Sequence, residues 1–247
     1  MIFEICIDSV EAALAAQAAG AQRVELCDNL VEGGTTPSLG MLRIVRRAVR
    51  IELNCMIRPR GGDFYYSDDE FEVMRQDVMA ARSEGADGVV FGLLLPDGSL
   101  DLARTKALVD LARPMSVTFH RAFDLCRDPD AALEQLAGLG VERILTSGQA
   151  ARAVDGLDVL SKLVRQAGDR IILLVGGGVK AHNVAEIIRK TRAKEVHFAA
   201  RSILESPMLH RVEGVLMGSA YSPNEYARKV TDEQLIREVI EAARLDG

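Results

Sequence analysis

Two short apolar segments near the start of the chain carry an acid and a thiol at alternate positions. Glu4 and Cys6 occupy these positions in the first segment, and Glu25 and Cys27 occupy them in the second. Because successive side chains of a β-strand point to opposite faces, each acid shares a face with its thiol if the segments are strands. Carboxyl groups can transfer protons, and two soft thiolates suit Cu(I). One face of two neighbouring strands is therefore predicted to carry the chemistry.

An arginine and two histidines occupy the same kind of position in later segments. Arg58 and His120 end apolar runs, and His197 alternates with apolar residues in another. Imidazole titrates near neutral pH, which suits it to acid and base catalysis. The candidate catalytic residues are Glu4, Glu25, Arg58, His120 and His197.

Each of these residues also has a purely structural interpretation. A buried carboxylate without a partner is costly, so Glu4 and Glu25 are either protonated or paired, for example with Arg58. A lone cysteine is often a small core residue, and two thiols fall short of a tetrahedral zinc site. The shared face of Cys6 and Cys27 makes this pair a candidate site for Cu(I).

Loops after the predicted strands add positive charge and glycine. Guanidinium groups and the amides of glycine-rich turns can bind an anion such as phosphate, which barrel enzymes often hold after their last two strands. Internal neutralisation by Glu25, Asp63 and Asp124 is the structural alternative. The candidate anion-binding residues are Arg60, Asp63, Arg121, Asp124, Gly176, Gly177, Gly178 and Arg201.

Eight apolar, β-branched runs must position these residues, and each is followed by a stretch of helical character. Eight βα units in about 250 residues predict an α/β fold, a single (β/α)₈ TIM-type barrel with its site at the strand C-termini. The competing doubly wound sheet usually opens with GxGxxG, which this chain lacks. The predicted strands are Ile2–Ile7, Arg23–Cys27, Leu53–Arg58, Gly88–Leu93, Met115–His120, Arg143–Ser147, Ile171–Val175 and Glu195–Phe198.

Capping signals mark the ends of several predicted helices. The pairs Asp8/Glu11, Ser67/Glu70 and Thr231/Gln234 have the spacing of capping boxes. Pro129 after Asp128 suits a first helical position. Gly20, Gly85 and Gly140 precede strands, where a left-handed residue ends a helix.

Composition and charge exclude several classes of protein. The chain has 247 residues and a net charge of −6, which disfavours nucleic acid and anionic membranes as partners. No apolar run approaches the roughly 18 residues of a membrane span, and the acidic start does not resemble a signal peptide. Four cysteines without a CxxC pair indicate reduced thiols, although the role of Cys126 stays open. We therefore expect a cytoplasmic protein with one domain, residues 1–247, and one long connection at about residues 199–231.

Seven further motifs lie along the chain: EGGTTPS at 32–38, IRPRGGDF at 57–64, YSD at 66–68, VTFHRAFD at 117–124, LTSG at 145–148, EVH at 195–197 and ARS at 200–202. Together these motifs resemble the CutC copper homeostasis family from end to end. The resemblance implies a cytoplasmic (β/α)₈ barrel, commonly a homo-oligomer, that is linked to copper tolerance and has Cys6 and Cys27 as proposed Cu(I) ligands. It implies no reaction. Phe198-Ala199 departs from the family, where a small polar residue or cysteine is common.

Two functions of different classes remain open. The resemblance favours a Cu(I)-binding protein that uses Cys6 and Cys27. The residues themselves favour an enzyme for a small anionic metabolite, phosphorylated or sugar-like, because acids, imidazoles and guanidiniums converge on one predicted barrel mouth.

Overall fold

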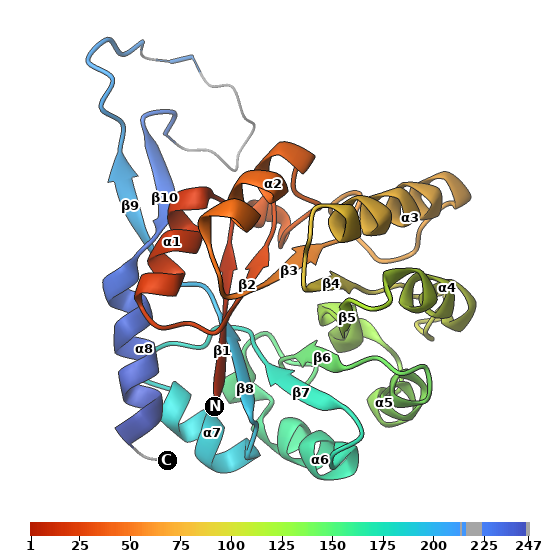
Figure 1. The fold of residues 1–247 in the computed structure, drawn as a ribbon. Coiled ribbons are helices and arrows are strands. Elements are labelled where there is room, and N and C mark those ends of the chain that lie inside the picture. The colour runs from red at the N-terminus through yellow and green to blue at the C-terminus, as the bar shows by residue number, and fades with distance from the viewer. Residues whose placement is uncertain (213, 216–223, 246–247) are drawn as a thin grey trace.

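Eight parallel strands close into a barrel in the computed structural model, which describes residues 1–212, 214–215 and 224–245 (Figure 1). Each strand pairs with its neighbours in the sequence, and β8 closes the barrel against β1. The predicted fold is confirmed. The strands are β1 Ile2–Ile7, β2 Arg23–Leu26, β3 Glu52–Met56, β4 Gly88–Phe91, β5 Ser116–Phe119, β6 Arg143–Thr146, β7 Ile172–Val175 and β8 Glu195–Phe198.

Helices surround the barrel, as Figure 1 shows. None of the described helices is both long and apolar enough to cross a membrane. Three short 3₁₀ helices lie in the connections, η1 Leu30–Glu32, η2 Arg121–Leu125 and η3 Ala153–Asp155. The α-helices are α1 Val10–Ala18, α2 Leu39–Ala48, α3 Asp68–Ser83, α4 Leu102–Ala112, α5 Pro129–Gly138, α6 Leu157–Ala167, α7 Val184–Thr191 and α8 Glu233–Leu245.

The predicted helix ends are largely correct. Ser67 and Glu70 form the capping box of α3, and Asp128 caps α5 with Pro129 at its first turn. Gly20, Gly85 and Gly140 all have positive φ, as predicted.

Two predicted caps are wrong by one residue. Ser9 caps α1 in place of Asp8, because its extended backbone lets Oγ accept the Ala12 N–H at 3.1 Å. At α8, Asp232 replaces Thr231, since its carboxylate accepts the backbone N–H groups of Gln234 and Leu235.

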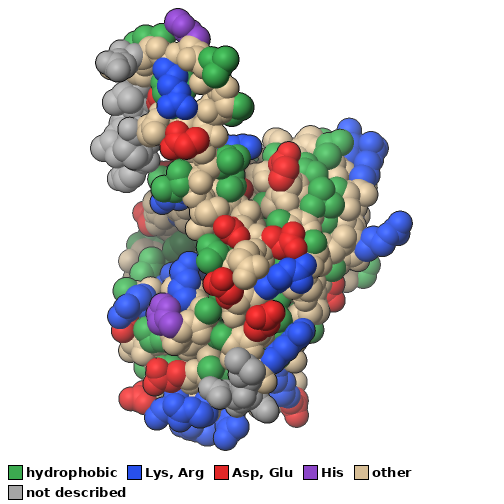
Figure 2. Space-filling view, turned by 90° about the vertical axis from the view of Figure 1, so that its left-hand side faces the viewer, with side chains coloured by type: hydrophobic (Ala, Val, Ile, Leu, Met, Phe, Trp, Pro, Cys, Tyr) green, Lys and Arg blue, Asp and Glu red, His purple; other side chains and the backbone are tan. Residues whose placement is uncertain are grey.

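The long connection after β8 contains a two-stranded antiparallel sheet that the sequence analysis did not anticipate. It pairs β9, Arg201–Glu205, with β10, Ala227–Thr231. This hairpin extends away from the barrel, and apolar side chains lie on its visible surface (Figures 1 and 2). Ile203 and Leu209 are among its exposed apolar residues.

The strands divide their side chains between two separate apolar regions. Ile5, Leu26 and Ile57 belong to the main core, together with apolar side chains of the helices. Cys27, Met56 and Val90 form a second buried cluster, against which Cys6 and Leu30 pack. The alternation in the sequence therefore separates residues packed beneath the helices from residues directed into the barrel.

Candidate functional site

A fully buried carboxylate, Glu4, joins three neighbouring strands inside the barrel. Its Oε2 accepts hydrogen bonds from Arg23 on β2 and from Asn54 Nδ2 on β3, the latter at 3.0 Å. Its Oε1 lies 2.8 Å from Nδ1 of His197 on β8. Burial raises the pKa of Glu4, but the nearby Arg23 and His197 outweigh burial and lower it to about 2. Glu4 is therefore a carboxylate at neutral pH.

Arg23, and not Arg58, neutralises the buried acids near the N-terminal ends of the strands. Its guanidinium donates to both Glu4 and Glu195 and is 1% exposed. Glu195 also accepts from Arg143 Nε at 3.0 Å. The expected pairing of Arg58 with Glu4 or Glu25 is wrong, because the register of β1 and β2 places Arg23 opposite Glu4.

The two candidate metal ligands meet on the side of this network nearer the strand C-termini. The Sγ atoms of Cys6 and Cys27 lie 4.0 Å apart. The sulfur of Cys27 also lies 3.4 Å from Oε2 of Glu25. Cys27 is buried and Cys6 is partly exposed.

The surroundings give the two thiols different acidities. A hydrogen bond from Cys27 and the positive charges of His197 and Arg201 outweigh burial and lower the pKa of Cys6 to about 5. The thiolate of Cys6, together with burial, raises the pKa of Cys27. Cys6 is thus the thiolate of the pair at neutral pH, and Cys27 is its hydrogen-bond donor.

His197 lies between the two buried glutamates. Its Nε2 is 3.7 Å from Glu25 Oε2, on the opposite side of the ring from Glu4. Burial lowers the pKa of His197, yet Glu25, Cys6 and Glu4 raise it above its usual value. Burial also raises the pKa of Glu25 to about 8, despite the positive charge of His197. At neutral pH the cationic His197 faces a charged Glu4 and a protonated Glu25.

His120 is neutral and helps to shape the loop that follows β5. Its Nδ1 accepts the N–H of Ala122 at 3.1 Å, which caps η2. Burial, with a contribution from Arg58, lowers the pKa of His120 to about 3. The buried Nε2 has no hydrogen-bond partner within the described residues.

Arg58 anchors the loop that covers Cys27. Its guanidinium donates to the carbonyl oxygens of Glu32 and Gly34 at 2.8 Å, and to that of Gly62 at 2.9 Å. Gly34 has a φ of +95°, and a Cβ there would lie 3.0 Å from the sulfur of Cys27. The loop therefore needs glycine at position 34 to close over this sulfur.

Most of the candidate anion-binding arginines are neutralised by nearby acids. Arg60 pairs with Glu70 at 2.5 Å and with Asp63 at 3.1 Å. Arg121 pairs with Asp124 at 2.7 Å, and Asp124 also accepts from the hydroxyl groups of neighbouring residues. These contacts match the structural alternative that the sequence left open for Asp63 and Asp124.

Arg201 differs from these arginines. It begins β9 on the side of the cysteines, and within the described residues it makes no ion pair or side-chain hydrogen bond. In the turn after β7, the N–H of Gly176 is already donated to Thr146 at 3.0 Å. Gly177 and Gly178 follow with φ of +99° and +70°.

Sequence reasoning missed Arg23 as the partner of the buried acids. It shares its strand face with Glu25, so the alternation that identified Glu25 could also have identified Arg23.

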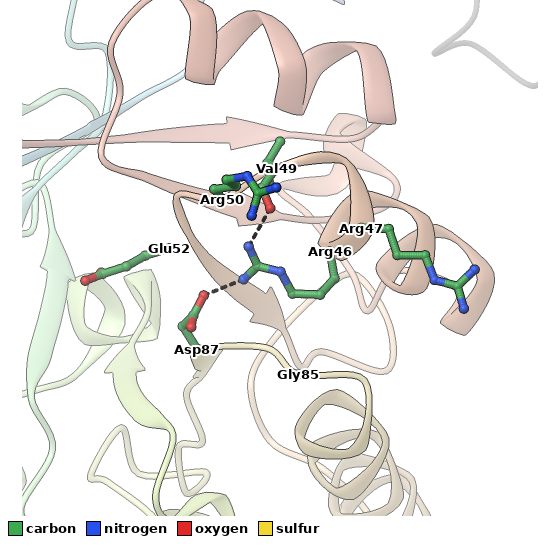
Figure 3. Close-up of a pocket in the computed structure, with 7 residues that line it drawn as sticks. All are labelled: Arg46, Arg47, Val49, Arg50, Glu52, Gly85 and Asp87. Carbon is green, nitrogen blue, oxygen red and sulfur yellow. Dashed lines mark hydrogen bonds and ion pairs between the residues drawn. The ribbon is translucent and has the colours of Figure 1, made fainter.

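A separate open pocket of about 510 Å³ lies at the N-terminal side of the barrel, away from the cysteines (Figure 3). Arg46 crosses it and contacts Asp87 at 2.6 Å and the carbonyl of Val49 at 2.8 Å. The pocket is lined by Arg46, Arg47, Val49, Arg50, Glu52, Gly85 and Asp87.

Two overlapping groups of side chains could hold a metal ion among the described residues. Cys6, Glu25 and Cys27 form one group, and Glu4, Glu25 and His197 form the other, each with its ligand atoms within 4.8 Å of one another. The first group contains two soft sulfur donors, which fit Cu(I). In the second group Glu4 is already occupied by Arg23.

Comparisons with known proteins agree with this architecture. Residues 1–202 match the sequence model of the CutC family. The human copper homeostasis protein cutC homolog is 49% identical over 236 residues, which cover 96% of this chain and 86% of that protein. A CutC family protein of Chromobacterium violaceum is 50% identical over 241 residues, 98% of this chain and 97% of that protein.

Solved structures resemble the chain at two levels. The CutC protein of Streptococcus agalactiae superposes with a TM-score of 0.77 at 34% identity and covers 80% of this chain and 97% of its own. Phosphoribosylanthranilate isomerase from Thermotoga maritima reaches 0.57 at 15% identity, with 99% of both chains covered, which reflects the barrel fold alone.

Proposed function

The chain belongs to the CutC family, and from this membership we propose that it binds one Cu(I) ion as cargo between the thiols of Cys6 and Cys27. The separation of 4.0 Å between the two sulfur atoms is the observation that carries the proposal. Two metal–sulfur bonds of about 2.3 Å, the length found at zinc sites, span up to about 4.6 Å. An ion between these sulfurs therefore requires little movement of either strand.

The charges around the thiols support binding of a soft cation. Cys6 is ionised at neutral pH, and binding of the metal displaces the proton of Cys27. The two thiolates and Cu(I) leave one negative charge, which the cationic His197 and Arg201 offset. The ion can enter the site beside Cys6, which is partly exposed. Cys27 offers no such entry, because the loop anchored by Arg58 covers it.

Anaerobic titration with Cu(I) against a competing chelator tests the proposal. The wild-type protein should take up one equivalent, and the Cys6→Ser/Cys27→Ser variant should lose this uptake. Cys126→Ser is the matched control, since Cys126 lies in the loop before α5 and away from the pair. Equal affinity in the wild type and the double variant would overturn the proposal.

The cellular setting is part of the same proposal. Four free cysteines among the described residues are consistent with the reducing cytoplasm.

We take residues 1–247 as one domain, because α8 packs against α1 and α7 and completes the ring of helices. The exposed Ile203 and Leu209 of the hairpin support a homo-oligomer, since apolar patches favour contact with another chain.

A second candidate function is binding of a small anion near the same mouth, as in an enzyme for an anionic metabolite. The guanidinium of Arg201, which makes no ion pair with any residue that the structure describes, favours it, and the glycine turn after β7 can supply backbone N–H groups. The pairing of Arg60 and Arg121 with their own acids weakens it. Glu4, Glu25, His120 and His197 remain its acid and base candidates, with His120 acting only as a neutral donor.

A further inference from the structure

We propose that the thioether of Met56 is the third ligand of the Cu(I) ion and makes the site selective for Cu(I) over Zn²⁺. This inference rests on the proposed binding of copper by Cys6 and Cys27. The observation behind it is a small sulfur-rich cluster inside the barrel, distinct from the main apolar core.

Strand register brings Met56 beside Cys27. Leu26 of β2 pairs with Cys55 of β3, so the next residues along the two strands are Cys27 and Met56. Adjacent strands lie about 4.8 Å apart, and these two residues follow positions that pack beneath the helices. Both side chains are consequently directed into the barrel.

The packing of the interior places three sulfur-containing side chains in one cluster. Cys27, Met56 and Val90 are buried, and Cys6 and Leu30 pack against them. Met56 is 3% exposed. No other methionine within the described residues belongs to this cluster, and the buried Met74 and Met115 lie in the main core.

Chemistry favours a thioether at this position over the neighbouring carboxylate. Cu(I) prefers soft thiolate and thioether donors, whereas Zn²⁺ also accepts carboxylate oxygens. Glu25 Oε2 lies 3.4 Å from the Cys27 sulfur and would give Zn²⁺ a third ligand beside the two thiols. Met56 adds no charge to a buried anionic centre.

Methionine is also able to reach the ion. Its three rotatable side-chain bonds let the sulfur move within a packed interior without moving the strand. Val90 and Leu30 enclose the cluster with apolar surface, which excludes water from competing for the third position.

X-ray absorption at the copper edge, on full-length protein labelled with selenomethionine and loaded with Cu(I), tests the proposal directly. Of eight methionines, Met56 alone should place selenium in the first copper shell, beside two sulfurs. Met56→Leu should remove the selenium shell and keep both sulfurs, while Met74→Leu should keep all three ligands. A wild-type spectrum with two sulfurs and no selenium would overturn the role of Met56 and leave the cysteine pair intact.

Affinity measurements separate this inference from the proposed function. Met56→Leu should weaken Cu(I) at least about tenfold, comparable to losses from removing groups that support a metal site, and leave Zn²⁺ affinity unchanged. Unchanged thermal unfolding of the metal-free variant would show that its barrel is intact. An equal loss of affinity for Cu(I) and Zn²⁺ in Met56→Leu would contradict the proposed selectivity. Absence of Cu(I) binding in the wild type would instead overturn the proposed binding by Cys6 and Cys27.

Discussion

Cys6 and Cys27 bring their sulfur atoms to 4.0 Å although their α-carbons are not register partners. The residue opposite Cys6 on β2 is Glu25, and Cys27 follows two positions later. Strands of a barrel tilt relative to its axis, so residues that are offset along two strands can meet inside it. The same offset puts Glu25 beside both sulfurs, within the group of three ligand atoms that lie within 4.8 Å of one another.

Removal of Arg23 should destabilise the barrel strongly. Arg23→Met leaves Glu4 and Glu195 without their shared guanidinium, and breaking a buried pair typically costs about 3–5 kcal/mol. Arg43→Ala breaks the more exposed pair with Glu84 and should cost far less, because solvent screens exposed ion pairs. Urea unfolding of the three proteins measures the difference, and similar losses in both variants would contradict a stabilising role for the interior network.

The two interior histidines should have opposite protonation states. His120 should stay neutral from pH 5 to 8 with its proton on Nε2, because burial lowers its pKa to about 3 and Nδ1 accepts from Ala122. His197 should be protonated on both nitrogens, because its acidic neighbours raise its pKa. Imidazole ¹⁵N spectra, assigned with His120→Gln and His197→Gln, report both states. Titration of His120 near its ordinary value of about 6.5 would refute the assignment.

Glu25→Gln should change how stability depends on pH. Folding raises the pKa of Glu25 from 4.5 to about 8, so the folded state retains a proton that the unfolded state releases in this range. The stability that protonated Glu25 contributes is therefore fully present below pH 4.5 and is lost as pH rises through about 8. The variant should gain stability over the wild type between pH 5 and 8. Glu11→Gln on the surface is the control, and parallel curves for all three proteins would count against the buried acid.

The anion hypothesis predicts that inorganic phosphate raises the melting temperature with increasing concentration, as any ligand of the folded state does. Arg201→Ala should reduce this shift by more than half, because the guanidinium of Arg201 lies near the mouth and has no ion-pair partner in the described part of the chain. Arg47→Ala in the pocket of Figure 3 is the control and should keep the shift. An undiminished shift in Arg201→Ala, or no shift at millimolar phosphate, would remove the second function.

The fold could be predicted from the sequence because its signals are local and repeated. Each strand shows an apolar run, and alternation within β1 and β2 correctly separated Ile5 and Leu26 from the residues directed inward. The predicted N-cap was correct where two residues cap each other's backbone, as Ser67 and Glu70 do at α3. The predicted N-cap was wrong by one residue where two adjacent side chains could each cap the helix, as Asp8 and Ser9 could at α1.

The partners of the site residues could not be predicted, because they depend on register and side-chain length. Alternation shows which face Glu4 occupies, but only the pairing of β1 with β2 and β8 shows that Arg23 and His197 reach it. Arg58 has the same face and charge, yet its guanidinium extends to the carbonyl groups of the loop at 32–34. The hairpin of β9 and β10 was missed because its strands lack a regular apolar alternation.

Anomalous diffraction at the copper edge, from crystals of the protein loaded anaerobically with Cu(I), would locate the bound ion. One strong peak should lie between the Sγ atoms of Cys6 and Cys27, inside the barrel and beneath the loop that Arg58 anchors. A peak at any other group of side chains, or no peak between these two sulfurs in protein that carries one equivalent of copper, would contradict the proposed binding by Cys6 and Cys27.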